Sequence, residues 1–269
     1  MHRRDYTVPL FVCVTCLLSA GCERSMIVGE VVDVKGEALP GVAVGVWGGE
    51  TRALTDGCGG YNLAFEPGVL ALEFIKTGYT PGRLELTVHK ARHVEATPVV
   101  LWPLPLSKGV YLFEDYRYRQ TTVARPRPYR SETHVMICGA KKMPELETSN
   151  TQPLVLCYKM PRYDLELCRM EQADVTLPEA ADPTYTVTVW ISVGSLPVAP
   201  EPVDQPDASL VEVRIPNPLE PGVYAVHWGA LDNYTTTDPH VFLFRVAGEA
   251  AETVVADGAD KDAPAPEDG

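Results

Sequence analysis

The chain has 269 residues, 45% of them hydrophobic, and a formal net charge of −13. This length is sufficient for two small domains with ordinary cores. So acidic a composition argues against a nucleic-acid partner, because nucleic-acid-binding domains usually carry a basic face. The 21 glycines and 24 prolines exceed what helical proteins tolerate, which favours short strands separated by turns.

The N-terminal segment has the pattern of an export signal. Arg3 and Arg4 precede an apolar, uncharged run at residues 7–18. A run of this length is too short to span a bilayer but is typical of the hydrophobic region of a signal peptide. The sequence therefore predicts an exported protein.

Residues 18–22 read Leu-Ser-Ala-Gly-Cys, which resembles the lipobox of bacterial lipoprotein signals. The resemblance implies that residues 1–21 are removed, that Cys22 carries lipid and that residues 22–25 form a tether to the membrane. An ordinary signal peptide with a chance cysteine is the alternative. Glu23 follows the cysteine, rather than the Asp associated with inner-membrane retention. We therefore expect the outer membrane, with a secreted or periplasmic protein as the alternative location.

Residues 26–102 alternate apolar and polar side chains in several short runs. The runs at 42–46, 70–74 and 84–88 are the clearest, and turn signals such as Asp56-Gly57 separate them. Alternation places one face of each strand on a core. About seven strands and no helical pattern predict a β-sandwich.

The same segment carries a series of motif residues in order along the chain: Gly29, Val31, Asp33, Gly36, Leu39, Pro40, Gly41, Val42, Val44, Thr55, Asp56, Gly59, Tyr61, Pro67, Gly68, Leu72, Gly78 and Tyr79. These motifs resemble the carboxypeptidase regulatory-like domain, a transthyretin-like sandwich. The resemblance implies a β-sandwich that accompanies other modules as a stability or binding unit, and it implies no reaction. Cys58 departs from the pattern, in a turn where a small or polar residue is usual.

Residues 103–133 read as a connector that contains a hairpin at 109–119. Its stretch at 125–130, Arg-Pro-Arg-Pro-Tyr-Arg, is not expected in a central strand, because proline lacks an N–H. The connector holds the chain's basic and aromatic patch, whose hypothetical ligand is anionic: a polysaccharide, a lipid headgroup or the chain's own acidic tail. A solvated hairpin and loop is the alternative. The patch comprises Arg117, Arg119, Arg125, Arg127, Arg130, Tyr116, Tyr118 and Tyr129.

Residues 134–246 contain further short runs rich in β-forming residues, separated by proline-rich loops. They predict a second antiparallel sandwich or a small barrel, so the expected fold class is all-β. We recognise no family in this half. Residues 247–269 carry seven acidic residues and one lysine, a composition that predicts a disordered acidic tail.

Four cysteines remain outside the signal and the lipidation site, and an even number in an exported protein favours disulfides. Cys157 and Cys168 flank a turn at 160–162 and are expected to face each other across a ladder. Cys58 and Cys138 would then join the two domains. The alternative is that Cys138 pairs within its own domain and Cys58 stays free.

Signatures of catalysis are weak. The chain lacks a nucleophile elbow, a phosphate-binding loop and a zinc-protease motif. His227 and His240 lie in neighbouring predicted strands, with Asp232 and Asp238 between them, and are weak candidates for a metal or acid–base site.

The expected function is therefore that of a non-catalytic, lipid-anchored envelope protein that binds a glycan, a peptide or a protein. The membrane is a partner through the lipid, and we expect no cofactor and no nucleic acid. A passive structural component is the alternative function, and a hydrolase or metal site in the second domain is the least favoured.

Overall fold

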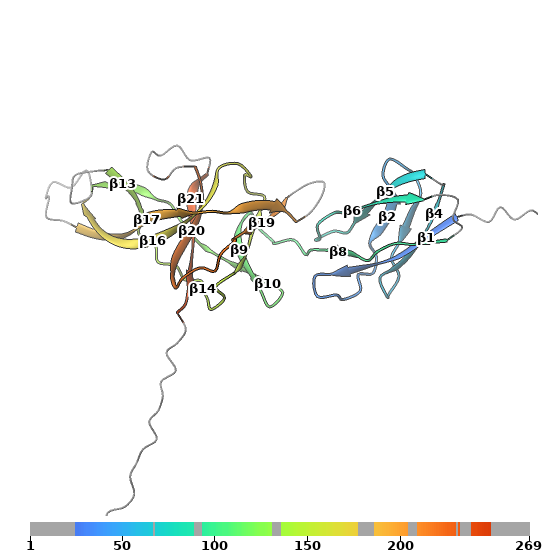
Figure 1. Cartoon of the computed structure of the whole chain (residues 1–269), viewed down its shortest axis with the longest axis horizontal. Helices are drawn as coiled ribbons and strands as arrows, with labels where there is room; N and C mark the ends of the chain where they lie inside the picture. The colour runs from blue at the N-terminus through green and yellow to red at the C-terminus, as the bar shows by residue number, and fades with distance from the viewer. Residues whose placement is uncertain are drawn as a thin grey trace, which may run out of the picture.

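The computed structural model describes residues 25–66, 68–88, 93–130, 136–176, 186–203, 209–229, 231 and 238–248. These residues form β-strands, turns and loops, which confirms the predicted all-β class. The strands gather into two bodies that follow one another along the long axis of the molecule (Figure 1). No helix in the described part of the chain is long and apolar enough to cross a membrane.

The first unit is a sandwich of two four-stranded sheets, as the alternation predicts. One sheet has the order β4-β1-β7, with β8 also paired to β1, and the other has the order β3-β2-β5-β6. The strands are β1 (Ser25–Asp33), β2 (Ala43–Val46), β3 (Arg52–Leu54), β4 (Gly60–Phe65), β5 (Gly68–Ile75), β6 (Gly82–Val88), β7 (His93–Glu95) and β8 (Val99–Leu101).

Several of the motif residues named in the sequence analysis have structural roles in this unit. Asp33 accepts hydrogen bonds from the N–H groups of Lys35 and Glu37, at 2.8 and 2.9 Å, and so holds the turn after β1. Gly29 on β1 lies directly opposite Tyr61 on β4. A Cβ atom at Gly29 would lie 2.6 Å from the Tyr61 hydroxyl oxygen, so the glycine makes room for the ring.

The second unit packs a five-stranded sheet, β10-β9-β15-β19-β18, against an eight-stranded sheet. The larger sheet has the order β11-β21-β20-β16-β12-β13-β17, and β14 pairs with β21. The strands are β9 (Gly109–Glu114), β10 (Arg117–Gln120), β11 (Thr122–Ala124), β12 (Arg127–Arg130), β13 (Met136–Ala140), β14 (Glu147–Thr148), β15 (Leu154–Tyr158), β16 (Leu165–Thr176), β17 (Thr186–Leu196), β18 (Ala199–Pro202), β19 (Leu210–Arg214), β20 (Gly222–Trp228) and β21 (Asp238–Val246).

Residues 103–133 were predicted to form a connector, and the structure corrects this boundary. Strands β9 and β10 form the expected hairpin, but they belong to the five-stranded sheet, and β11 and β12 belong to the eight-stranded sheet. Pro128 lies within β12, contrary to the expectation for a central strand. It is tolerated because β16 pairs with β12 only at Arg130, so no ladder flanks the proline on that side.

Part of the larger sheet closes on itself. Strands β16, β12, β13 and β17 pair in that order, and β17 also pairs directly with β16. Tyr129, Val175 and Val189 form a separate buried cluster among these strands. The second unit thus combines a sandwich with a small closed ring of strands, whereas the sequence left the two architectures as alternatives.

An ordered joint connects the two units. The N–H of Leu104 donates to the carbonyl of Gly78 at 2.8 Å, which ties the connecting segment to the first unit. Trp102 packs against Phe113 of the second unit, with ring centroids 5.1 Å apart. The hydroxyl of Tyr118 donates to the carbonyl of Pro103 at 2.6 Å.

The predicted disulfide pairing is wrong, because the four candidate cysteines are free thiols. Cys157 lies on β15 in the five-stranded sheet and Cys168 on β16 in the eight-stranded sheet, so the two do not face each other across a ladder. Cys157 belongs to the core between the sheets, whereas Cys168 belongs to a different cluster. Cys58, exposed after β3, and Cys138 on β13 form no bridge between the units.

Candidate functional site: a basic hollow in the second unit

A hollow of about 370 Å³ opens where the chain crosses from β11 to β12, beside the end of β13. Four of its lining side chains are cationic and the others are apolar or aromatic. We call it the basic hollow. Its lining residues are Val123, Ala124, Arg125, Arg127, Tyr129, Lys141 and Lys142.

The pairing of β12 with β13 brings these cations together. Arg127 lies opposite Gly139 at the end of the ladder, and Arg125 and Lys141 each follow two residues beyond that pair, at the same end. Gly139 permits close packing here, because a Cβ atom at that position would lie 2.7 Å from Cγ2 of Val189. The pairing of strands therefore brings these four cations together, since they do not form one run in the sequence.

Within the described part of the chain, the charges in the basic hollow are largely uncompensated. Lys142 makes a long ion pair with Glu145, at 3.8 Å between Nζ and Oε1. Among the described residues, Arg125, Arg127 and Lys141 make no ion pair. Like charges on neighbouring strands repel each other, so an anion placed between them would stabilise this arrangement.

Tyr129 is the buried polar group of the hollow, with 1% of its surface exposed. Burial raises the pKa of its hydroxyl, while the positive charge of Arg127 acts in the opposite direction. The phenol is therefore neutral at physiological pH and retains a proton that can be donated in a hydrogen bond.

The structure divides the predicted basic and aromatic patch. Arg117 and Arg119 lie on β10, at the edge of the other sheet, and Arg119 is paired with Glu114 at 2.6 Å. Tyr118 points into the joint and Tyr116 is exposed. Only Arg125, Arg127 and Tyr129 of the predicted set line the hollow, and Arg130 stands at the other end of β12.

Lys141 and Lys142 were missed by the sequence analysis, although two consecutive lysines directly after a strand were a visible signal. Cys22, the predicted lipidation site, and Asp232 lie outside the described residues, as does the side chain of Asp238. Their predicted roles remain predictions.

His227 has structural contacts and no triad geometry. It is buried on β20, with Nδ1 2.9 Å from the carbonyl oxygen of Gly229 and Nε2 4.0 Å from a carboxylate oxygen of Glu166. Ser195 donates to that same carboxylate at 3.0 Å. The carboxylate thus separates the serine from the histidine, whereas serine activation requires the histidine beside the serine.

His240 lies on the neighbouring strand β21. Within the described ranges, no group of three or more His, Cys, Asp or Glu side chains is placed to hold a metal ion. Asp232 and the side chain of Asp238 are outside those ranges, so the site predicted from His227, His240 and these two aspartates stays a prediction.

No family model and no curated protein sequence matches this chain. Among solved structures it is similar to a type II cohesin–X-dockerin complex of Acetivibrio cellulolyticus, at 15% identity, a TM-score of 0.27 and coverage of 29% of this chain and 58% of the other. It is also similar to a streptococcal ancillary pilin (12% identity, TM-score 0.25, coverage of 86% and 61%). The major pilin subunit BcpA of Bacillus cereus is another (10%, 0.26, coverage of 83% and 69%).

Proposed function

We propose that this protein is a non-catalytic, lipid-anchored binding module of the bacterial cell envelope, and that its second unit binds an anionic partner in the basic hollow. The observation that carries the proposal is that four cationic residues line one hollow in a chain with a net charge of −13. Carboxylate, sulfate and phosphate groups on glycans, peptides or proteins share the chemistry that such a hollow recognises.

The lining of the basic hollow can also orient a bound ligand. Arg125 and Arg127 offer planar guanidinium donors, whereas Lys141 and Lys142 offer rotatable ammonium groups. The buried Tyr129 ring and the side chains of Val123 and Ala124 supply an apolar lining beside the charges. A ligand with an anionic group next to an apolar or ring-shaped portion would use both parts.

Charge reversal tests this proposal. The probes are fluorescein-labelled dextran sulfate and labelled polyglutamate, with uncharged dextran as the negative control, and the measurement is fluorescence anisotropy over a salt series. We expect Arg125→Glu and Lys141→Glu each to weaken binding by about tenfold or more, because each removes a charged hydrogen-bond donor. Arg117→Glu makes the same change of charge on β10, outside the hollow, and should change binding little.

Two results would contradict the proposal. An equal loss of affinity in Arg117→Glu would show that net charge alone attracts the probes. Failure of the wild-type chain to bind either acidic probe at low salt would show that the hollow is no anion site.

The lipid anchor is a separate part of the proposal and rests on the resemblance of residues 18–22 to a lipobox. Acyl chains on Cys22 would hold the chain at the outer membrane, since each buried methylene contributes about 0.8 kcal/mol. Metabolic labelling with a fatty acid should mark the wild type and not Cys22→Ser. Label retained in that variant would contradict lipidation at this residue.

A structural component of an envelope assembly is the second candidate, and the ordered joint favours it. The aromatic side chains of Trp102, Phe113 and Tyr118 pack together between the units. Such packing favours a fixed distance between a partner bound to the first unit and a partner bound to the second. Copurification with an envelope complex at a fixed stoichiometry, unchanged in Arg125→Glu, would favour this function over ligand binding.

A further inference from the structure

The free edge of β6 differs from the other sheet edges of the described chain. β6 has seven residues, stands at the end of the β3-β2-β5-β6 sheet and pairs with β5 alone. The other strands that pair on one side alone in the described ranges are shorter, and β18 also contains Pro200 and Pro202. The longer β17 ends the order of the larger sheet but pairs with both β13 and β16. Short strands and prolines prevent unwanted edge pairing, and β6 has neither protection.

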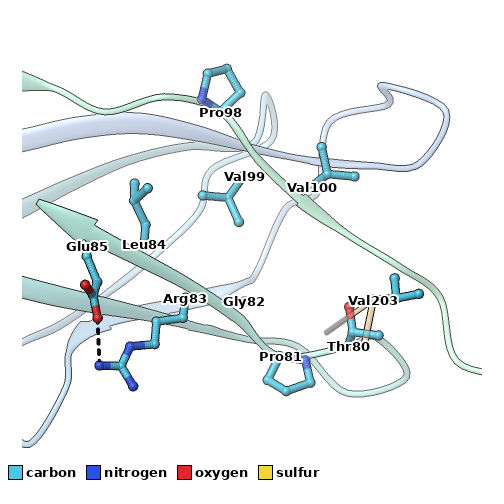
Figure 2. A pocket seen from close by; sticks show the side chains of 10 residues that line it. All are labelled: Thr80, Pro81, Gly82, Arg83, Leu84, Glu85, Pro98, Val99, Val100 and Val203. Atoms are coloured by element: carbon cyan, nitrogen blue, oxygen red, sulfur yellow. Dashed lines mark hydrogen bonds and ion pairs between the residues drawn. The ribbon is translucent and has the colours of Figure 1, made fainter. Parts of the chain in front are cut away.

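Space is available beside this edge. A hollow of about 540 Å³ lies along β6 and β8, and Val203 of the second unit contributes to its lining. Figure 2 shows Arg83 and Glu85 extending together from one face of β6, joined by an ion pair of 3.1 Å. Leu84 extends from the opposite face, toward Val99 on β8 (Figure 2).

The sequence of β6 is complementary to itself. In an antiparallel pair of two β6 strands related by a two-fold axis, the residue at the axis faces its own copy. With Leu84 at the axis, Arg83 of each copy faces Glu85 of the other, and the small Gly82 faces Leu86. With Glu85 or Arg83 at the axis, two like charges face each other instead, which is unfavourable.

We propose that β6 pairs antiparallel with β6 of a second copy of this chain, with Leu84 at the two-fold axis, so that two copies share one continuous sheet. The unpaired N–H and C=O groups of the edge would bond to each other, and two crosswise Arg83–Glu85 pairs would fix the register. This interface is independent of the basic hollow, which belongs to the other unit.

Analytical ultracentrifugation of the full chain over a wide concentration range tests the proposal. We expect a dimer whose dissociation constant rises by about tenfold or more in Arg83→Glu and in Glu85→Arg, because each variant places like charges opposite each other twice. The double variant exchanges the two charges, restores both crosswise pairs and should recover the dimer.

The matched control is Arg52→Glu. It breaks a comparable ion pair of 3.0 Å between Arg52 on β3 and Glu73 on β5 of the same sheet, away from the β6 edge, and should leave dimerisation unchanged. Circular dichroism confirms that each variant is folded. A wild-type chain that is monomeric at every concentration overturns the proposal, and so does a dimer that both single variants leave intact or that the double variant fails to restore. Pairing of β6 with another polypeptide would then be the remaining interpretation of this edge.

Discussion

The Gly29–Tyr61 pair gives a sharp prediction for the stability of the first unit. In Gly29→Ala, the new Cβ atom would lie 2.6 Å from the hydroxyl oxygen, 2.7 Å from Cζ and 2.9 Å from Cε1 of Tyr61. The ring has little room to move away, because it is 2% exposed and packs edge-on against Phe74 at 5.6 Å between centroids. Overpacking of this kind costs about 1–3 kcal/mol. In a unit of this size, 1 kcal/mol corresponds to roughly 4–8 °C in melting temperature.

Differential scanning calorimetry of the intact chain measures the effect, and hydrogen exchange assigns the weakened transition to the first unit. Gly57→Ala is the control, because a Cβ atom at Gly57 meets no atom within 4 Å. Its melting temperature should stay close to that of the wild type. If Gly29→Ala melts as the wild type does, the ring has another place to go, and the explanation of Gly29 as space for Tyr61 is refuted.

Further predictions concern four features of the chain: Tyr61, His227, the cysteines and the joint. Tyr61→Phe should stabilise the first unit by about 1 kcal/mol, because the hydroxyl has no hydrogen-bond partner among the described residues. Burial raises the pKa of Tyr61 to about 12 from 10.0, so the unfolded chain loses this proton first as the pH rises above 10. The free energy of unfolding should therefore fall between pH 10 and about 12. Urea titrations should show a smaller fall in Tyr61→Phe. Burial lowers the pKa of His227 below 6.5, so stability should fall as pH drops below 6.5, and less steeply in His227→Gln. Iodoacetamide should modify exposed Cys58 in the native chain well before Cys157, whose pKa burial raises, and mass spectrometry would show the order. Trp102→Ala should loosen the joint, so that limited proteolysis cuts between the units while each unit keeps its own melting transition.

The fold of the first unit could be predicted in detail because the interactions that define it lie within single turns or between directly paired strands. Alternation identified the core strands, and residues such as Val44 and Leu72 are buried as expected. The turn residue Asp56 accepts hydrogen bonds from the N–H groups of Cys58 and Gly60, both at 2.9 Å. Each of these effects joins residues in one turn or on directly paired strands, which is the range that a sequence pattern reports.

The disulfide prediction failed at a crossing between sheets. The segment between β15 and β16 does turn, with Lys159 and Asp164 both at positive φ, and the carbonyl of Pro161 accepts a hydrogen bond from the Trp228 indole at 2.7 Å. A turn signal does not state which sheet the next strand joins. Here the chain passes from the five-stranded to the eight-stranded sheet, and Leu165 pairs with Trp228 instead of returning along β15.

The basic hollow shows the same limit for a functional site. The arginines at 117–130 are conspicuous in the sequence, yet those at 117 and 119 lie on β10 in one sheet and those at 127 and 130 on β12 in the other. Arg125 and Lys141 are distant in sequence and become neighbours only through the register that pairs Arg127 with Gly139. Which cations line the hollow therefore depends on how the strands that carry them pair. The density of basic residues along the sequence does not predict it. The same reasoning applies at β6, where the alternation of Arg83 and Glu85 has no evident meaning until the strand is found at an edge and opposed to its own copy.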